Sequence, residues 1–454
     1  MDHPMRGSGL ILVLLSALPA AAAAPRQGPW NVILVIEDTV RADHTTPYGY
    51  ARDTTPAMAE LARKGAVFEA ALAQSNWTFP ALASMFTGQR PATHGVFVPS
   101  DRLGPAQPTL AELFRERGFQ TAAFTAGFID TRSMGLDRGF DYVAGFHRPW
   151  DRGQGLGSMG QAMPPALRWL ESKSSSTFFL LIHGADAHYP YDCPRDYFLR
   201  FIPPNPDADL PGPGDVALLQ AFDLAAGVDW RGMPPEFIRT AEAMKKKPED
   251  MARLSARLSA RYDGCMSYGD SRLSALYAAM TRLRLWGNTI LIATADHGEA
   301  LGEHGGFGHY QRPMYDEVLR VPLVVWHPGV PGLAGRRVRE PVEEIDLLPT
   351  LMDWEGWHSP PGTQGRSFRS LLEGAPRPGA GAGRYAQAAR HGTGKKVLDL
   401  EAFRSGDWKV IRQGSRWELF DLAADPGESR SQLDREPERF MQLAAEMMRL
   451  KTRP

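Results

Sequence analysis

Three short runs of consecutive apolar residues stand out along the chain. They cover 31–36 (NVILVI), 177–182 (TFFLLI) and 289–293 (TILIA). Uninterrupted apolar runs of this length are typical of strands buried on both faces of a sheet. Stretches with helical periodicity, such as 55–64 and 251–283, lie between them. Strands alternating with helices predict a doubly wound α/β domain, with a mostly parallel sheet and helices on both faces.

Each apolar run leads into side chains that can bind a cation. Asp38 follows the first run, and Asp186 and His188 follow the second. Asp296 and His297 follow the third. Ligands of open α/β sheets bind at the carboxyl ends of the strands, so we expect these three segments to converge. Carboxylate and imidazole groups together suit a divalent metal with mixed oxygen and nitrogen ligands.

Thr78 begins a second candidate segment, because it precedes Pro80 and a helical pattern that stops before Gly88. Two interpretations of its hydroxyl are possible, and the local sequence alone favours the first. It can cap the helix N-terminus, with proline near the first helical position. Alternatively, it lies where free N–H groups attract a sulfuryl or phosphoryl group, and a metal activates it as a nucleophile.

Three histidines are further candidates. His188 lies in a polar loop after the second strand, which favours contact with a substrate oxygen or acid catalysis. His304 and His309 lie in the glycine-rich segment GEHGGFGHY. Glycines let the backbone approach a ligand closely, although they also serve ordinary turns. We therefore expect substrate binding by these histidines, with His309 as the better candidate of the last two.

The C-terminal part has a different pattern. A Pro/Gly-rich stretch at 373–383 predicts a linker, and alternation over 408–412 and 417–422 predicts a hairpin. A helix is expected at 436–451. These elements predict a small α+β subdomain with an antiparallel sheet. Another Pro/Gly-rich stretch, 203–214, begins an insertion (203–239) that we expect to shape the substrate pocket.

The charge balance bears on the partners of the protein, and its first residues bear on its location. Among 454 residues, 51 Lys and Arg nearly cancel 52 Asp and Glu, which gives no indication of a nucleic-acid partner. Arg6, the apolar run 10–18 and the small residues 19–24 are typical of a secretory signal. The run is short for an uncleaved anchor, and Pro19 interrupts it. We expect a signal peptide at 1–24 and a periplasmic or secreted protein with no integral membrane segment after cleavage.

The chain has two cysteines, Cys193 and Cys265. In an oxidising compartment they can form one disulfide, and two separate thiols are equally compatible with the sequence.

Five segments, in the same order, resemble the sulfatase family of the alkaline phosphatase superfamily. They are 33–50 (ILVIEDTVRADHTTPYGY), 75–96 (SNWTFPALASMFTGQRPATHGV), 294–310 (TADHGEALGEHGGFGHY), 314–326 (MYDEVLRVPLVVW) and 417–428 (WELFDLAADPGE). The resemblance implies an alkaline-phosphatase-like catalytic domain over 29–372 and a C-terminal subdomain over 384–454.

The resemblance also implies roles for single residues. Asp38, Asp296 and His297, together with the Thr78 hydroxyl, bind one divalent cation, which is Ca, Mn, Mg or Zn. Thr78 holds the position of the nucleophile. His188 and His309 hold substrate oxygens, and His309 stands where many members have lysine.

The chain departs from the family at the nucleophile. The sulfatase signature is Cys or Ser, any residue, Pro, Ser, Arg, and its first residue becomes formylglycine; here the run is TFPAL (78–82). Threonine is not a substrate for that conversion, so no formylglycine is expected. Thr39 also stands where many sulfatases carry a second metal-binding aspartate. A sulfated threonine cannot collapse to an aldehyde, so an activated water must release the sulfate.

We therefore expect a metal-dependent hydrolase of sulfate or phosphate esters, with Thr78 as nucleophile. Its substrate would be a small molecule or a glycan or lipid ester. Threonine nucleophiles are familiar in related phosphodiesterases and phosphoryl-group transferases, so such an enzyme is the alternative. A catalytically inactive binding homologue is the third hypothesis.

Overall fold

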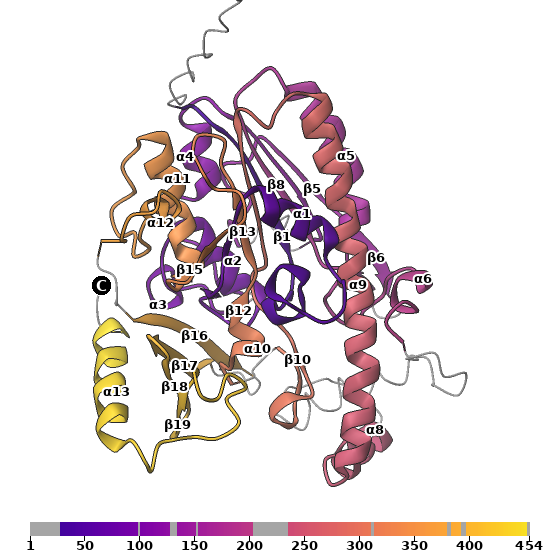
Figure 1. Ribbon diagram of the computed structural model, residues 1–454, viewed down its shortest axis with the longest axis vertical. Coiled ribbons are helices and arrows are strands. Elements are labelled where there is room, and N and C mark those ends of the chain that lie inside the picture. Colours follow the sequence, from indigo (N-terminus) through magenta and orange to yellow (C-terminus); the bar gives the residue numbers. More distant parts are fainter. Residues whose placement is uncertain are drawn as a thin grey trace, which may run out of the picture.

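The computed structural model describes residues 28–98, 100–127, 134–150, 153–202, 235–309, 313–378, 383–391 and 396–451. Its centre is an eight-stranded sheet (Figure 1). In spatial order the strands are β14 (Arg336–Val338), β2 (Ala66–Phe68), β13 (Leu323–Trp326), β9 (Thr289–Thr294), β1 (Asn31–Glu37), β8 (Phe178–Gly184), β4 (Gln120–Thr125) and β5 (Tyr142–Gly145).

The three strands expected from the apolar runs lie side by side at the centre of this sheet. β1 pairs in parallel with β8 on one side and with β9 on the other, so Leu34 lies opposite both Leu181 and Ile292. β13 is antiparallel to β9 and to β2. The prediction of a mostly parallel sheet is confirmed, and β1, β8 and β9 end at the same edge.

Helices cover both faces of the sheet, as the alternation of side chains along β1 shows. Ile33 and Val35 pack on one face in a cluster with residues of α1 (Pro56–Lys64), α5 (Met159–Lys173) and α9 (Pro248–Arg282). Leu34 and Ile36 pack on the other face with residues of α2 (Thr78–Thr87), α4 (Leu110–Arg115) and α11 (Leu347–Glu355). All four side chains are at most 2% exposed. Burying each contributes roughly 1.5–3 kcal/mol, which explains why the strand is apolar throughout.

The C-terminal part forms a separate antiparallel sheet (Figure 1). Its strands are β16 (Arg384–His391), β17 (Lys396–Ser405), β18 (Trp408–Gln413) and β19 (Arg416–Asp421), and α13 (Pro437–Lys451) packs on it through Leu443 and Met447. The predicted hairpin and final helix are confirmed. Lys409 Nζ lies 2.6 Å from Asp316 Oδ1 of the larger domain.

Shorter elements complete the described chain. They are β3 (Ala71–Leu72), β6 (His147–Trp150), β7 (Gly153–Leu156), β10 (Ala300–Leu301), β11 (Phe307–Gly308), β12 (Arg320–Val321), β15 (Val342–Glu343), α3 (Pro91–His94), α6 (Arg195–Phe198), α8 (Pro235–Met244), α10 (Asp316–Leu319) and α12 (Arg369–Leu372), with 3-10 turns at Ala42–His44, Thr46–Tyr48, Glu303–Gly305 and Glu344–Asp346.

Cys193 and Cys265 form a disulfide that ties the segment after β8 to α9, which settles the question left open by the sequence. Within the ranges given above, no helix has the length and apolar character that crossing a membrane requires. The expected signal (1–24), the Pro/Gly-rich stretch 203–214 and residues 379–382 of the expected linker lie outside the described residues. The domain boundaries 29–372 and 384–454 stay predictions.

Candidate active site

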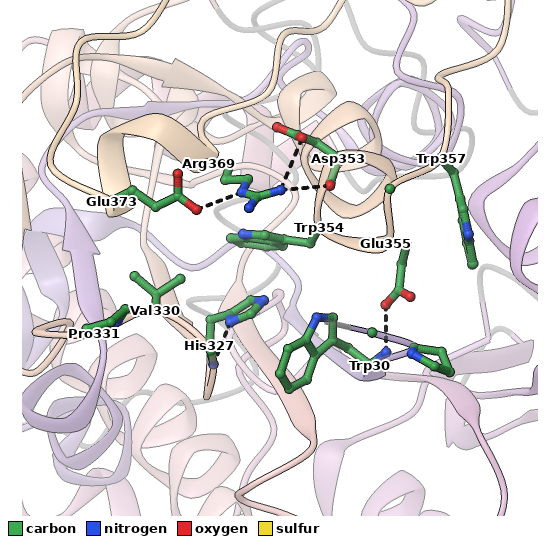
Figure 2. Close-up of a pocket in the computed structure, with 14 residues that line it drawn as sticks. Trp30, His327, Val330, Pro331, Asp353, Trp354, Glu355, Trp357, Arg369 and Glu373 are labelled. Carbon is green, nitrogen blue, oxygen red and sulfur yellow. Dashed lines mark hydrogen bonds and ion pairs between the residues drawn. The ribbon is translucent and has the colours of Figure 1, made fainter. Parts of the chain in front are cut away.

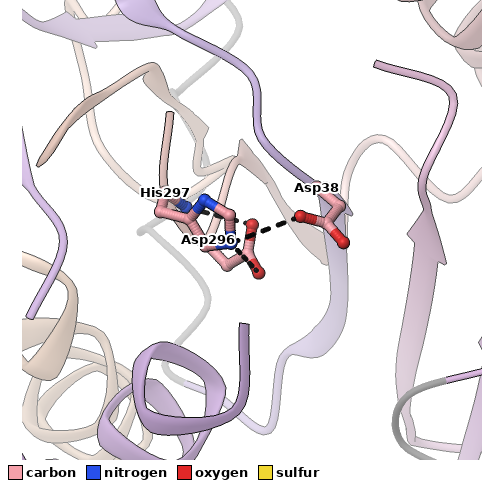
Figure 3. Close-up of side chains that lie close together, drawn as sticks. All are labelled: Asp38, Asp296 and His297. Carbon is pink, nitrogen blue, oxygen red and sulfur yellow. Dashed lines mark hydrogen bonds and ion pairs between the residues drawn. The ribbon is translucent and has the colours of Figure 1, made fainter. Parts of the chain in front are cut away.

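Asp38, Asp296 and His297 form a compact cluster at the carboxyl edge of the sheet (Figure 3). Asp38 directly follows β1, and the other two come just after β9, the neighbouring strand. One potential ligand atom from each residue lies within 4.8 Å of the other two. His297 Nε2 is 3.5 Å from both Asp38 Oδ1 and Asp296 Oδ2. The predicted convergence of these strand ends is confirmed.

The chemistry of this cluster fits a divalent cation. All three side chains are completely buried. Both carboxylate oxygens of Asp38 and Oδ2 of Asp296 receive no hydrogen bond from any described part of the chain. Burial, followed by the charges of Asp296 and Glu299, raises the pKa of Asp38 well above its usual value. Buried carboxylates are costly unless a positive charge compensates them, and two carboxylates with one imidazole are suitable cation ligands.

The orientation of His297 supports the same role. Its Nδ1 lies 2.9 Å from the carbonyl oxygen of Gly298, which can only accept a hydrogen bond. Nδ1 therefore carries the proton, and the lone pair is on Nε2, the atom that faces the carboxylates. Burial lowers the pKa of His297 to about 4, so the ring is neutral at physiological pH. Asp296 is positioned as well, because its Oδ1 accepts the N–H groups of Thr39 and His297 at 3.3 and 3.0 Å.

Thr78 joins the cluster from another element. It is the first residue of α2, is 2% exposed, and its Oγ1 lies 3.3 Å from His297 Nε2. The residue at the N-cap position is Trp77, which makes no side-chain capping bond. The Thr78 hydroxyl is therefore not the N-cap, and it lies at a helix N-terminus beside the candidate metal ligands.

Two further histidines extend from the cluster in a row. The ring centroids of His309 and His297 are 4.4 Å apart, and those of His188 and His309 are 5.1 Å apart. His188 Nδ1 donates to the carbonyl oxygen of Tyr189 at 2.6 Å, and burial lowers the pKa of His188 to about 4. The structure thus places His309 next to His297, and His188 next to His309.

Glu299 is a site residue that the sequence interpretation missed. Its Oε1 lies 3.1 Å from His309 Nδ1, and its side chain is fully buried. A carboxylate at this position orients the imidazole and stabilises its protonated form. Its position, three residues after Asp296, is the feature of the sequence that could have identified it.

His304 contacts two glutamate residues and a tyrosine ring. Its Nδ1 lies 2.8 Å from Glu317 Oε1, its Nε2 lies 3.1 Å from the carbonyl oxygen of Glu428, and its ring stacks on Tyr315 at 3.6 Å. Burial alone would lower the pKa of His304, but the hydrogen bond and charge of Glu317 raise it to about 9. His304 therefore joins the loop after β9 to the C-terminal subdomain. Its predicted contact with substrate is still a prediction.

Asp186, the other acid predicted at this edge, accepts a hydrogen bond from the N-terminus of a helix. Its Oδ2 accepts the backbone N–H of Met159, the first residue of α5, at 2.6 Å.

The backbone that carries Asp38 is held by a tyrosine from α9. The next residue, Thr39, has φ 63°, which is uncommon and strained for a β-branched residue. The hydroxyl of Tyr262 donates to the carbonyl oxygen of Thr39 at 2.7 Å and accepts the N–H of Arg41 at 2.8 Å. Tyr262 thus spans the turn on both sides and positions the first acid of the cluster.

Comparisons with known proteins agree with this geometry. The sulfatase family model matches residues 30–357, and a model of the C-terminal part of N-sulphoglucosamine sulphohydrolase matches 302–453. N-acetylglucosamine-6-O-sulfatase of Bacteroides thetaiotaomicron is 24% identical, over 93% of this chain and 86% of that protein. Human iduronate 2-sulfatase is 26% identical, over 82% of this chain and 78% of that protein.

Solved structures show the same fold. A protein crystallised with D-glucosamine-2-N,6-O-disulfate superposes with a TM-score of 0.74 at 20% identity, covering 93% of this chain and 97% of that one. The phosphonate monoester hydrolase of Agrobacterium radiobacter superposes with a TM-score of 0.71 at 22% identity, covering 92% and 96%. The expected fold class is confirmed. Because the family model spans well over half of the chain, this protein belongs to the sulfatase family and is a hydrolase of sulfate esters.

Proposed function

We propose that Thr78 is the nucleophile of this hydrolase and that Asp38, Asp296 and His297 hold a divalent cation beside it. The observation that carries the proposal is the 3.3 Å separation between Thr78 Oγ1 and His297 Nε2, next to two buried carboxylates. Such a cation, when bound, neutralises the carboxylates and lowers the pKa of an adjacent hydroxyl. The family match supports a metal-dependent reaction, and this chain supplies a threonine where formylglycine is usual.

The protein groups around Thr78 suit an anionic ester. The first turn of α2 offers N–H groups without acceptors inside the helix, and the positive end of the helix dipole favours negative charge there. Glu299 orients His309, which we propose as the acid that protonates the leaving group. The ring of His188 packs against His309. Preorganised dipoles of this kind supply most of the acceleration in transfers of sulfuryl and phosphoryl groups.

The bond changes follow two steps. First, the bond between Thr78 Oγ1 and sulfur forms as the hydroxyl gives up its proton to water, the bond from sulfur to the alcohol oxygen breaks, and that oxygen takes a proton from His309. Second, a water oxygen attacks sulfur, and the bond to Oγ1 breaks to release sulfate and regenerate the hydroxyl. Water must act in the second step because a threonine ester has no hydroxyl with which to expel sulfate as an aldehyde forms.

A glycan ester is the substrate class that the relatives favour. N-acetylglucosamine-6-O-sulfatase and iduronate 2-sulfatase are both named for sulfated sugars. We therefore propose sulfated saccharides as substrates.

One observation favours a second candidate. Thr78 replaces the residue that becomes formylglycine, and a fold relative hydrolyses phosphonate monoesters. Phosphorus esters of threonine can be cleaved by water, so a phosphate or phosphonate monoesterase using the same residues is the alternative.

Parallel assays distinguish these possibilities. The purified protein is supplied with Ca²⁺, Mn²⁺, Mg²⁺ or Zn²⁺ and tested on glucosamine 6-sulfate, 4-nitrophenyl sulfate, 4-nitrophenyl phosphate and a phenylphosphonate monoester. We expect Thr78→Val, which keeps the shape of the side chain, to lower kcat by at least roughly 10³-fold. Thr78→Ser should retain measurable turnover.

The matched control is Thr87→Val at the other end of α2, because Thr87 is also buried but its hydroxyl donates to the carbonyl of Ala83. Full activity of Thr78→Val would contradict the nucleophile. Turnover of phosphorus esters alone would establish the second candidate. No turnover of any ester by the wild-type protein would indicate an inactive binding homologue.

We further propose that the protein is exported to the periplasm or the medium. The disulfide between Cys193 and Cys265 supports this location, because such bonds persist in oxidising compartments. Fractionation of cells that express the full chain, followed by mass determination of the N-terminus, tests export and cleavage after Ala24.

A further inference from the structure

A cavity lies at the amino end of β1, and Figure 2 shows the residues that line it. Its volume is about 670 Å³, which is in the range of small-molecule sites. Trp30, which precedes β1, lines it, whereas Asp38 follows the other end of the same strand. Eight residues of extended chain span roughly 25 Å, so the cavity is remote from the catalytic cluster.

Three tryptophans form much of its wall: Trp30, Trp354 and Trp357 (Figure 2). The ring of His327 is packed between the first two, with centroid distances of 4.9 Å to Trp30 and 4.7 Å to Trp354. Trp357 packs edge-on against Phe114 at 5.3 Å, and the guanidinium of Arg117 lies over its ring, 4.5 Å from the centroid. These contacts hold the aromatic wall in place without a ligand.

The charged groups of the cavity are mostly acidic. Asp353, Glu355 and Glu373 line it with a single guanidinium, that of Arg369. Arg369 is already engaged, because its Nε lies 2.7 Å from Glu373 Oε1 and its Nη1 lies 3.4 Å from Asp353 Oδ1. Burial lowers the pKa of His327 to about 4, so this ring adds no positive charge. The lining therefore has a surplus of negative charge.

Glu355 is the carboxyl without a cationic partner among the lining residues. Its Oε1 accepts the backbone N–H of Trp30 at 2.9 Å. Burial raises the pKa of Glu355 to about 7. A half-buried carboxyl beside aromatic rings is stabilised in its charged form when a cation approaches.

We propose that this cavity binds an organic cation, an ammonium group with apolar substituents, through Trp30, Trp354 and Glu355. Ammonium groups are attracted to the faces of tryptophan, and a nearby carboxylate adds a direct charge interaction. The acidic lining disfavours the anionic sulfate esters that the catalytic cluster serves. This site is independent of the proposed function, because it shares no residue with the cluster.

Calorimetric titration with choline tests the proposal, and 3,3-dimethyl-1-butanol, its uncharged analogue of the same shape, is the matched ligand. We expect choline to bind at least tenfold more tightly than the alcohol. Glu355→Gln should weaken choline binding at least tenfold. The control Glu60→Gln should leave it unchanged, because Glu60 is a surface carboxyl that pairs with Lys64. Far-UV circular dichroism verifies that each variant is folded.

Three outcomes would overturn the proposal: no heat at millimolar choline, equal affinity for choline and the alcohol, or unchanged binding by folded Glu355→Gln. Hydrolysis assays give an independent readout. Saturating choline should leave KM for the ester unchanged, whereas competitive inhibition would place the cation at the catalytic cluster and refute the second site.

Discussion

Removing the hydroxyl of Tyr262 should loosen the turn that carries Asp38. In Tyr262→Phe, the carbonyl of Thr39 loses a donor at 2.7 Å and the N–H of Arg41 loses an acceptor at 2.8 Å. Leaving one buried polar group unpaired costs about 1–3 kcal/mol, so the two together predict a loss of roughly 2–6 kcal/mol in the free energy of unfolding. Urea unfolding of the metal-free protein measures this change.

The same substitution should lower activity. Thr39 has a positive φ, and strain at such a residue is on the order of 1–3 kcal/mol. Once Tyr262 no longer holds both sides of the turn, that strain favours relaxation of the backbone and moves Asp38 away from Asp296. We expect kcat/KM to fall at least tenfold, because displacement of a proposed catalytic group such as Asp38 by even about 1 Å costs this much or more.

Tyr277→Phe is the matched control on the same helix. Tyr277 is also buried, but its hydroxyl makes one bond, to the carbonyl of Ala57 at 3.2 Å, and α1 carries no residue of the cluster. It should cost about 1 kcal/mol and leave kcat/KM unchanged. If Tyr262→Phe and Tyr277→Phe lose equal stability, or if Tyr262→Phe keeps full activity, the role assigned to Tyr262 is wrong.

Three other measurements address the rest of the molecule. Reducing the Cys193–Cys265 disulfide, whose cysteines are 72 residues apart, should lower the free energy of unfolding by about 4 kcal/mol on the loop-entropy model, and a change below about 1 kcal/mol would contradict it. His304 has a raised pKa in the folded state, so the stability from its pair with Glu317 is complete below about pH 6.5 and is lost as pH rises through about 9. Urea unfolding across this range should show a loss of about 1–2 kcal/mol after screening by solvent, absent in His304→Gln. Removing the cation with a chelator should lower Tm, and adding the preferred cation back at about 100 times its Kd should restore about 3 kcal/mol of unfolding free energy. The variant Asp38→Asn should gain less stability from the cation, and an equal gain would exclude Asp38 as a ligand.

The centre of the fold could be predicted because its strands are buried on both faces. Continuous apolar runs such as 31–36 therefore identified β1, β8 and β9 directly. β4 was harder, since QTAAFT (120–125) mixes polar and small residues. The antiparallel direction of β13 also left no local signal, because strand direction depends on how the connecting segment returns to the sheet.

The candidate site was likewise predictable from the sequence only in part. Asp38, Asp296 and His297 could be placed together because each lies within three residues of the end of a strand, and these strand ends meet at one edge. Thr78 came from the family resemblance, and its approach to His297 depends on the packing of α2. The contact of His304 with the backbone of Glu428 could not be found in the sequence, because Glu428 is 124 residues away, in the segment that follows β19.

The pairing of β1 with β9 also has a kinetic consequence. The bond between Thr39 and Asp296 joins residues 257 positions apart, so the carboxylates of Asp38 and Asp296 come together only when β1 and β9 pair across that length of chain. Contacts of such long range slow folding, since the entropy of closing the chain is lost before the contacts form. Hydrolytic activity should therefore recover late in refolding, after the helical circular dichroism signal has returned. The time course of its recovery then reports when the central sheet is complete.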